Sequence, residues 1–153
     1  MTAKQYLEQY EKITIAIEDQ MLMIESLRTV AEKMTAELQA DRVQSSTDGR
    51  NSENIILNIA DEERWLEKLK ETRYAIGLEI TDNVRRYAPR QAKAVLGYYI
   101  MMDTLEAIGL SHPQRKSRQW ALDTRNEGER LIQNALMTHP EKFTLACLTR
   151  NEG

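Results

Sequence analysis

Residues 109–120, GLSHPQRKSRQW, hold the side chains of this sequence best suited to binding an anion. Arg115, Lys116 and Arg118 place three cations within four residues, and such cations bind the phosphate oxygens of nucleic acids. Ser111 and Gln114 have the spacing of a capping box, with Pro113 between them, so the pattern predicts a basic helix that begins at Ser111. A recognition helix presents its opening turns to base edges in the major groove.

The polar side chains of this predicted helix divide into two roles. Those of the opening turns would face base edges: Gln114, Arg115, Ser117 and Arg118. Lys116 and Arg125 would reach phosphates. An inward face of Trp120, Ala121 and Leu122 would pack on Leu105, Ile108 and Leu110. The alternative is a surface helix with solvated cations and Trp120 in a core.

Four more cations lie just upstream, around Pro89. Arg90 and Lys93 would extend a phosphate-binding track if they share the face of the basic helix. Otherwise they, like Arg85 and Arg86, complement the dipole at the end of the preceding helix.

The net charge of -3 is unevenly distributed along the chain. Residues 1–87 carry 12 Lys and Arg against 17 Asp and Glu, whereas residues 85–125 carry 8 against 3. A local positive charge on an acidic scaffold is typical of an added binding face, although patches of this size also arise by chance.

Other chemistry finds little support in the sequence. Phosphate-binding loops, dinucleotide fingerprints and metalloprotease motifs are missing, and the adjacent Glu62 and Glu63 point apart on a helix, so we expect neither an enzyme nor a cofactor. One cysteine, Cys147, and two histidines, His112 and His139, make a metal site unexpected. Each His lies in a predicted helix start, His112 in SHPQ and His139 in THPE, so we expect both to have a local structural role. Without a membrane-length apolar run or a signal peptide, we expect a soluble, cytoplasmic protein.

The elements that must position the basic segment are helical. Few Gly, Pro and aromatic residues predict an all-α fold, and Thr2 and Gln5 predict a capped helix start. From there a helix without Gly or Pro continues to Arg42, with a heptad seam. Its seam positions are Tyr6, Tyr10, Ile13, Ile17, Gln20, Ile24, Leu27, Ala31, Met34 and Leu38.

A second long helix is predicted after a polar loop at residues 40–52. Asn51 or Ser52 would cap it, and it would end near Arg86 and pack antiparallel on the first helix. Its seam positions include Ile55, Ile59, Leu66, Leu69, Ile76, Ile80 and Tyr87. Residues 1–87 would thus form a coiled-coil-like hairpin, and residues 88–153 a small helical unit.

Apolar residues away from the seam are too numerous for an isolated hairpin. They are Leu7, Ile15, Leu22, Met23, Leu57, Trp65 and Leu78. We expect a homodimer to cover them, the alternative being coverage by the C-terminal helices. In that C-terminal part, Thr138, Pro140 and Glu141 predict a last, short amphipathic helix that uses Phe143, Leu145, Ala146 and Leu148.

The segments MTAKQYLEQY, LRTVAEKMTAEL and DRVQSS resemble a family of small phage and prophage proteins of Gram-positive bacteria, the sigma-factor-like or ArpU-like transcriptional regulators. The resemblance implies a helix-turn-helix after the hairpin, here a candidate at residues 92–125. AVLGYYI (94–100) would supply its first part, TLEAIGLS (104–111) its second, and PQRKSRQWAL its basic helix. Tyr98 departs from the Arg of that pattern, and the turn after Ile108 is shorter.

These observations favour a transcriptional regulator that binds double-stranded DNA through the basic helix. Its hairpin would serve dimerisation or contact with RNA polymerase. The alternative is a helical interaction protein without DNA binding, whose seam and exposed Met21, Met23, Met101 and Met102 bind a host or phage protein.

Overall fold

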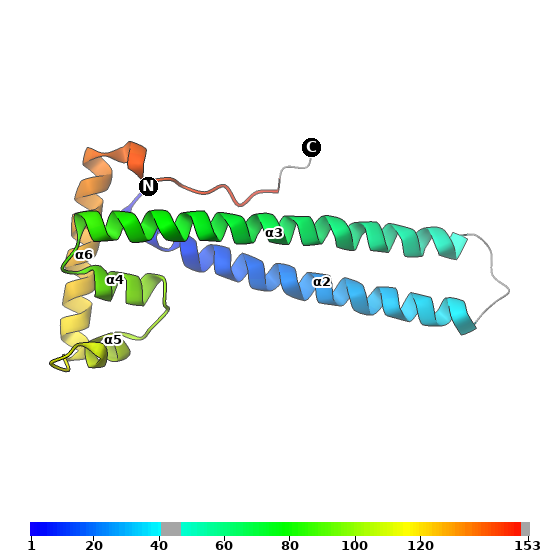
Figure 1. The fold of residues 1–153 in the computed structure, drawn as a ribbon, viewed down its shortest axis with the longest axis horizontal. Coiled ribbons are helices and arrows are strands. Elements are labelled where there is room, and N and C mark those ends of the chain that lie inside the picture. Colours follow the sequence, from blue (N-terminus) through cyan, green and yellow to red (C-terminus); the bar gives the residue numbers. More distant parts are fainter. Residues whose placement is uncertain (41–46, 151–153) are drawn as a thin grey trace. The chain divides into compact units, whose positions relative to one another are not determined.

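A computed structural model describes residues 1–40 and 47–150 of the chain (Figure 1). Every regular element within these residues is a helix, and none is a strand, which confirms the all-α prediction. The elements are α1 (Ala3–Leu7), α2 (Gln9–Ala40), α3 (Thr47–Tyr87), α4 (Ala92–Tyr99), α5 (Leu105–Ser111), α6 (Arg118–Thr138) and the 3₁₀ turn η1 (Pro140–Lys142).

The chain forms two compact units. Unit 1 comprises residues 1–14 and 72–149, and unit 2 comprises residues 15–71 and 150–153. The long helices α2 and α3 contribute residues to both units. By sequence, unit 1 carries 13 Lys and Arg against 10 Asp and Glu, a net charge of +3. Unit 2 carries 8 against 14, a net charge of -6.

The start of the first helix is as predicted, but its continuity is not. Thr2 Oγ1 accepts a hydrogen bond from Gln5 N at 3.2 Å, and Thr2 N donates to Gln5 Oε1 at 2.8 Å, so the capping box is confirmed. The expected single helix is instead divided at Glu8, where ψ is -10°. Ala3 N donates to Gln133 Oε1 of α6 at 2.7 Å, so tertiary contact with α6 holds α1 and overrides local continuity.

The second long helix begins earlier than predicted. Residues 47–52, expected in the loop, form the start of α3, so neither Asn51 nor Ser52 caps it. Gly49 costs only about 1 kcal/mol in a helix, and α3 contains no Pro, so propagation from the long helix extends through this weak segment. The predicted loop residues 41–46 lie outside the described residues. At its other end α3 stops at Tyr87, two residues before Pro89, close to the predicted Arg86.

The seam residues are buried to different degrees. In unit 1, Tyr6, Ile13, Ile76 and Ile80 are buried, and Tyr10 is half-buried. In unit 2, burial is greatest at Ile17, Gln20, Ile24 and Leu69. It is partial at Leu27, Ala31, Met34, Ile55, Ile59 and Leu66. The side chain of Leu38 lies outside the described residues.

A polar contact joins α2 and α3 within unit 2, where the two helices lie side by side (Figure 1). Gln20, only 7% exposed, donates from Nε2 to the backbone oxygen of Glu62 at 3.0 Å and to Glu62 Oε2 at 2.5 Å. Arg150 donates to Glu62 Oε1 at 2.5 Å. The hydrogen bonds from Arg150 and then Gln20 lower the pKa of the Glu62 carboxyl. A satisfied amide at this seam position favours one register of the two helices, because any shift would leave it unpaired.

A second polar cluster in unit 1 holds the segment after η1. Tyr6 Oη donates to Glu79 Oε1 at 3.0 Å and accepts from Asn83 Nδ2 at 2.9 Å. Burial, ahead of the Glu79 charge, raises the pKa of the Tyr6 phenol. Glu79 accepts from Thr144 N at 2.7 Å. Gln9, 5% exposed, accepts from Ala146 N at 2.7 Å and donates to the Thr144 oxygen at 3.0 Å.

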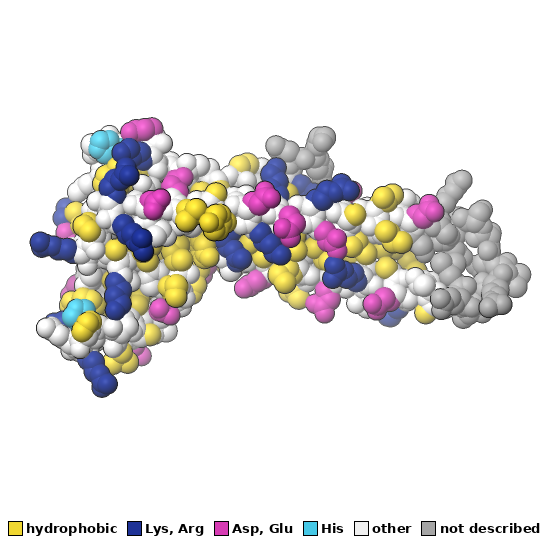
Figure 2. Space-filling model, in the orientation of Figure 1, with side chains coloured by type: hydrophobic (Ala, Val, Ile, Leu, Met, Phe, Trp, Pro, Cys, Tyr) yellow, Lys and Arg dark blue, Asp and Glu magenta, His cyan; other side chains and the backbone are white. Residues whose placement is uncertain are grey.

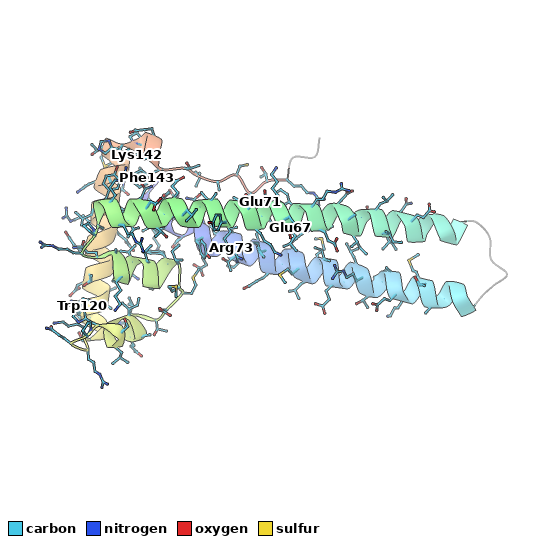
Figure 3. All side chains as sticks on the ribbon, in the orientation of Figure 1. Glu67, Glu71, Arg73, Trp120, Lys142 and Phe143 are labelled. Atoms are coloured by element: carbon cyan, nitrogen blue, oxygen red, sulfur yellow. The ribbon has the colours of Figure 1, made fainter. Side chains whose placement is uncertain are left out.

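The prediction of a final amphipathic helix is therefore wrong. Residues 143–150 are not helical, because side chains of Gln9 and Glu79 take up backbone groups that a helix would use. Phe143 is buried with its ring centroid 4.9 Å from that of Tyr6. The predicted Thr138 cap is also wrong, since Thr138 ends α6 and its hydroxyl donates back to the Asn134 oxygen. Lys142 and Phe143 are labelled in Figure 3.

Several apolar residues away from the seam remain uncovered. Ile15, Leu22, Met23, Leu57 and Leu78 are 49–62% exposed. Trp65 is half-buried, and Leu7 is buried in α1. The expectation that C-terminal helices cover these residues therefore fails for the five exposed ones.

Helix α6 packs tightly against Val95 of α4 and the preceding Gln91 at Gly128. A Cβ atom at Gly128 would lie 2.3 Å from Val95 Cγ2 and 3.1 Å from Gln91 Cβ. Val95 is fully buried, so it has no open space into which to move. The absence of a side chain at Gly128 therefore sets the distance between the two helices.

We predict that Gly128→Ala destabilises unit 1 by about 1–3 kcal/mol, because overpacking outweighs the gain of about 1 kcal/mol in helix propensity. Urea unfolding followed by Trp120 fluorescence in a Trp65→Phe background would measure the change. The control is Asn134→Ala at an exposed position of the same helix, expected to change stability by less than about 0.5 kcal/mol. Stabilisation by Gly128→Ala would contradict the packing described here.

Candidate nucleic-acid interface

Helices α4, α5 and α6 enclose a small core in unit 1. Its buried members are Ala94, Leu105, Ile108 and Ala121, with Tyr98, Trp120 and Leu122 packed against them. The two shorter helices match the predicted segments AVLGYYI and TLEAIGLS. Thr104 caps α5 by accepting a hydrogen bond from Ala107 N at 3.1 Å. Leu110, predicted to face inward, is 65% exposed because α5 turns its Leu105 and Ile108 side to α6.

The helix α6 begins later than the sequence pattern predicts for the basic helix. Ser111 is the last residue of α5, and its hydroxyl donates to the Ile108 oxygen at 2.7 Å. Ser117 caps α6 instead, its hydroxyl accepting from Trp120 N at 3.2 Å. Residues 112–117 form a turn between the helices, so the predicted helix start at Ser111 is wrong. We call these residues the α5–α6 turn.

Backbone geometry explains why the helix cannot begin at Ser111. Arg115 has φ 46°, a left-handed conformation that interrupts a right-handed helix. The oxygen of Gly109 accepts hydrogen bonds from His112 N at 3.2 Å and Lys116 N at 2.9 Å, which folds the turn back on α5. A Cβ atom at Gly109 would lie only 2.5 Å from the Lys116 oxygen. The turn thus depends on a glycine at this position.

The turn displays several of the predicted DNA-binding residues together. Gln114, Arg115 and Arg118 are exposed, and Lys116 is half-buried. Ser117 is exposed, but its hydroxyl serves as the α6 cap. Lys93 joins the group, because its Nζ donates to the Ser111 oxygen at 3.0 Å. Figure 2 shows Lys and Arg side chains distributed over this part of unit 1.

Arg90 is not brought to the turn. It is exposed in the bend before α4, and its neighbour Gln91 lies against Gly128 of α6. Gly128 is ten residues beyond Arg118 on α6, about 15 Å along the helix axis. Arg90, with Arg85 and Arg86 at the end of α3, therefore belongs to a separate part of the surface of unit 1.

Arg125, predicted to reach a phosphate, is engaged inside unit 1. Its side chain is 16% exposed, and its guanidinium carbon lies 4.4 Å from the centroid of the Tyr98 ring. Its Nε lies 3.5 Å from Glu129 Oε1, and Nη2 donates to Asn126 Oδ1 at 3.0 Å. Glu129 also accepts a hydrogen bond from the Tyr99 hydroxyl, whose pKa is raised by burial and then by this carboxylate. Arg125 therefore stabilises the packing of α6 on α4.

The two histidines take part in local structure, as predicted: His112 follows the end of α5, and His139 lies between the end of α6 and the start of η1. The His112 ring lies edge-on to Trp120, with centroids 4.9 Å apart, and its Nδ1 accepts from Gln114 N at 3.1 Å. Trp120, labelled in Figure 3, lies in the first turn of α6. His139 follows α6 and lies against Tyr87. His112 and Trp120 together support the turn that displays Arg115.

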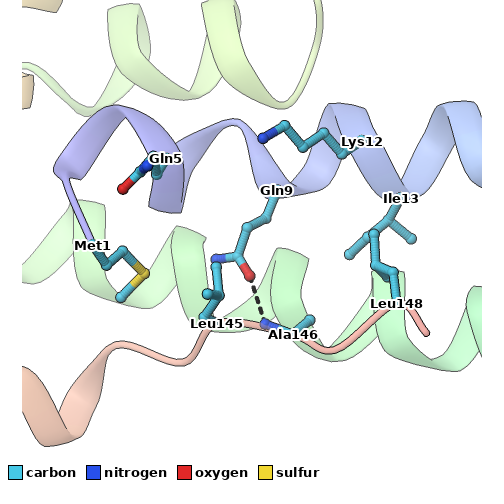
Figure 4. A pocket seen from close by; sticks show the side chains of 8 residues that line it. All are labelled: Met1, Gln5, Gln9, Lys12, Ile13, Leu145, Ala146 and Leu148. Carbon is cyan, nitrogen blue, oxygen red and sulfur yellow. Dashed lines mark hydrogen bonds between the residues drawn. The ribbon is translucent and has the colours of Figure 1, made fainter.

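A pocket in unit 1 was not predicted from the sequence (Figure 4). It has a volume of about 440 Å³ and lies between the α1–α2 region and the extended residues 145–148. Met1, Gln5, Gln9, Lys12, Ile13, Leu145, Ala146 and Leu148 line it. The lining is largely apolar, and it contains no pair of groups suited to acid–base catalysis. It depends on the non-local contact of Gln9 with Ala146, for which the sequence carries no signal.

Neither a metal centre nor a membrane span is found in the described part of the chain. Among residues 1–40 and 47–150, no cluster of three or more His, Cys, Asp or Glu could hold a metal ion. None of the described helices is both long and apolar enough to cross a membrane.

Substitution of the two candidate cap residues, Ser117 and Ser111, should change the stability of unit 1 by different amounts. Ser117→Ala removes the acceptor for Trp120 N and is expected to lower the free energy of unfolding of unit 1 by about 1 kcal/mol. Ser111→Ala removes only a donor to a helix oxygen and should change it by less than about 0.5 kcal/mol. Urea unfolding with Trp120 fluorescence would measure both. A larger loss at Ser111 would place the helix start where the sequence pattern suggested.

No protein-family model, curated protein or solved structure matches this chain.

Proposed function

We propose that this protein is a phage-type transcriptional regulator that binds double-stranded DNA through the α5–α6 turn and the first turn of α6. The observation that carries the proposal is the grouping of exposed Gln114, Arg115 and Arg118 at the start of a 21-residue helix braced by α5. Two helices joined by a tight turn, with cations on the turn and on the second helix, suit a duplex groove flanked by phosphates.

The electrostatics of unit 1 support contact with a polyanion. The described first turn of α6 holds no Asp or Glu, so no carboxylate neutralises Arg118 within that turn. The helix dipole adds a partial positive charge at the start of α6. Unit 1 as a whole has a net charge of +3, whereas unit 2 has -6. DNA phosphates are therefore attracted to unit 1 and repelled by unit 2.

The position of the α6 start reassigns the roles expected from the sequence. Arg118 now occupies the opening turn of the helix and is the residue proposed to face base edges. The exposed Gln119 lies beside it and donates from Nε2 to Asp123 Oδ1 at 2.9 Å. Arg115, Lys116 and Lys93 are proposed to contact phosphates. Ser117 holds the helix start, and Arg125 holds α6 on α4.

The order of the helices supports the resemblance to phage and prophage regulators on which the proposal partly rests. A long helical pair is followed by α4, α5 and α6, the order that the resemblance implies. The hairpin would serve dimerisation or contact with RNA polymerase or another protein. The net charge of -6 on unit 2 favours contact with another protein over self-association.

A second candidate function is that of a helical interaction protein without DNA binding. The exposed apolar residues of unit 2 favour it, since Met21, Leu22, Met23 and Val30 are 46–62% exposed. Binding to a protein partner together with no salt-dependent binding to duplex DNA would select this alternative.

We predict that the protein binds a labelled random-sequence duplex with a steep salt dependence. Three or four phosphate contacts imply that affinity falls about 40- to 150-fold between about 50 and 200 mM salt. Arg115→Glu/Arg118→Glu should abolish measurable binding, because it replaces two cations by anions beside the phosphates. Fluorescence anisotropy would give the dissociation constants.

The matched control is Lys4→Glu/Lys142→Glu, which changes the net charge of unit 1 equally at exposed positions away from the turn. It should keep most of the affinity and the same salt slope. If both double variants lost the same affinity, the binding would depend on the net charge of unit 1 and not on the α5–α6 turn. If the wild type did not bind duplex DNA at low salt, DNA binding by this protein would be rejected.

The left-handed backbone at Arg115 allows a test that separates DNA contact from folding. Arg115→Gly removes the cation and also removes the strain that a non-glycine residue has in the left-handed conformation. We therefore expect the free energy of unfolding to stay unchanged or to rise by up to about 1 kcal/mol. The duplex affinity should fall, and the slope of log affinity against log salt should decrease in magnitude by about 1. Urea unfolding and anisotropy on the same samples would check both. An unchanged salt slope would show that Arg115 contacts no phosphate.

A further inference from the structure

An apolar trough lies on unit 2 and is separate from the proposed DNA interface. Two adjoining pockets, of about 330 and 630 Å³, share Met21 and Arg28 as lining residues. Their apolar lining is formed by Met21, Leu22 and Ile24 of α2 and Leu66 of α3. Met21 and Leu22 are 51% and 62% exposed. We call this lining the trough floor.

Acidic side chains border the trough floor. Glu18 and Glu25 of α2 and Glu63 and Glu67 of α3 line the same two pockets. Arg28 is the one cation that lines them, and it donates to Glu63 at 2.5 Å, so its charge is balanced locally. Glu67 is labelled in Figure 3. Lys70 Nζ lies 3.5 Å from Glu67 Oε1, so the border carries four carboxylates against two cations. It is therefore negative, as is unit 2 overall.

The shape and composition of the trough match the groove that accepts an amphipathic helix. Its α2 side runs from Glu18 to Arg28, ten residues or about three helical turns, and rises about 15 Å. A helix lying along it would place apolar residues spaced three and four apart onto the floor. Methionine suits such a floor, because its unbranched, polarisable side chain adapts to differently shaped partners.

Charge decides between a second copy of the chain and a different partner. Two copies of unit 2 would bring together surfaces of net charge -6 each, with glutamates on both sides of the contact. Like charges facing each other at an interface are unfavourable. A partner helix with Lys or Arg beside its apolar stripe would instead pair with Glu18, Glu25 and Glu67 while it covers Met21 and Leu22.

We propose that the trough of unit 2 binds a basic, amphipathic helix of a partner protein. The apolar stripe of that helix contacts Met21, Leu22 and Leu66. Its cations contact the border formed by Glu18, Glu25 and Glu67. This site does not depend on DNA binding by unit 1.

The test uses the full chain and two synthetic amidated peptides of about 15 residues with the same leucine pattern. One peptide carries Lys at every polar position, and the other carries Glu. We expect the Leu/Lys peptide to bind with a micromolar dissociation constant, and the Leu/Glu peptide to bind at least about tenfold more weakly. Fluorescence anisotropy of labelled peptides at about 150 mM salt would measure both.

Two variants locate the binding on the trough. Met21→Ser/Leu22→Ser should weaken Leu/Lys binding at least about tenfold, through loss of the apolar floor. Glu18→Gln/Glu25→Gln should weaken it several-fold and reduce its salt dependence, through loss of the border charge. All four residues are exposed, so the fold should tolerate the changes, and circular dichroism would check this.

Matched controls lie elsewhere on unit 2. Ile56→Ser/Leu57→Ser removes two apolar residues that are each 61% exposed, and Glu32→Gln/Glu37→Gln removes two exposed carboxylates from α2. Both controls should bind the Leu/Lys peptide within about twofold of the wild type. Equal binding of the two peptides, or equal losses in trough and control variants, would overturn the proposal.

Sedimentation velocity tests whether a second copy of the chain, and not a partner helix, occupies the trough. A monomeric wild type supports the proposal, because the trough is then free for the partner helix. A wild-type dimer that Met21→Ser/Leu22→Ser converts to a monomer would assign the trough to a second copy of the chain and would overturn the proposal. DNA binding could fail in the duplex experiment without affecting either result, since the probes and variants are different.

Discussion

The close approach of backbone at Gly109 and Gly128 is the constraint on which the arrangement of unit 1 depends. Gly128 allows α4 to pack against α6, where a methyl group would overlap Val95. Gly109 allows the α5–α6 turn to fold onto α5 and so fixes where α6 begins. Since α6 also contacts α1 and η1, the position of α6 affects where these two elements lie in the unit. The display of Arg115 and Arg118 is thus a consequence of two glycines that carry no charge.

Buried amides provide the second kind of constraint. Gln9 and Asn83 in unit 1 and Gln20 in unit 2 occupy otherwise apolar surroundings, and each finds hydrogen-bond partners on another segment. A buried amide that lost its partners would cost about 1–3 kcal/mol, so these residues penalise alternative registers more than leucine would. Gln9 and Asn83 also hold backbone oxygens of residues 142–144, which explains how an extended segment is kept against helices.

The sequence predicted the elements whose signals are local and missed those that depend on distant contacts. The Thr2 capping box follows from residues three positions apart, and it was predicted correctly. The segments that form α4 and α5 were expected from the resemblance, and their bounds differ from the expected ones by one or two residues. Ser111 and Ser117 both fit a helix cap, and Pro113 favoured the wrong one locally. The choice between them is made by Gly109 and Lys116, which are seven residues apart. Likewise, the positive charge of Arg125 is visible in the sequence, but its contact with Tyr98 is not.

The separation of charge between the two units connects both proposed interactions. A chain with evenly mixed charge would attract DNA and a basic partner weakly over its whole surface. In the two proposed interactions, the net charge of +3 on unit 1 would attract phosphates and repel a basic helix, while -6 on unit 2 would have the reverse effect on each ligand. The charges that would attract one proposed ligand would thus repel the other, so repulsion would contribute to specificity as well as contact. Because α2 and α3 contribute to both units, this division lies along continuous helices and not at a linker between domains.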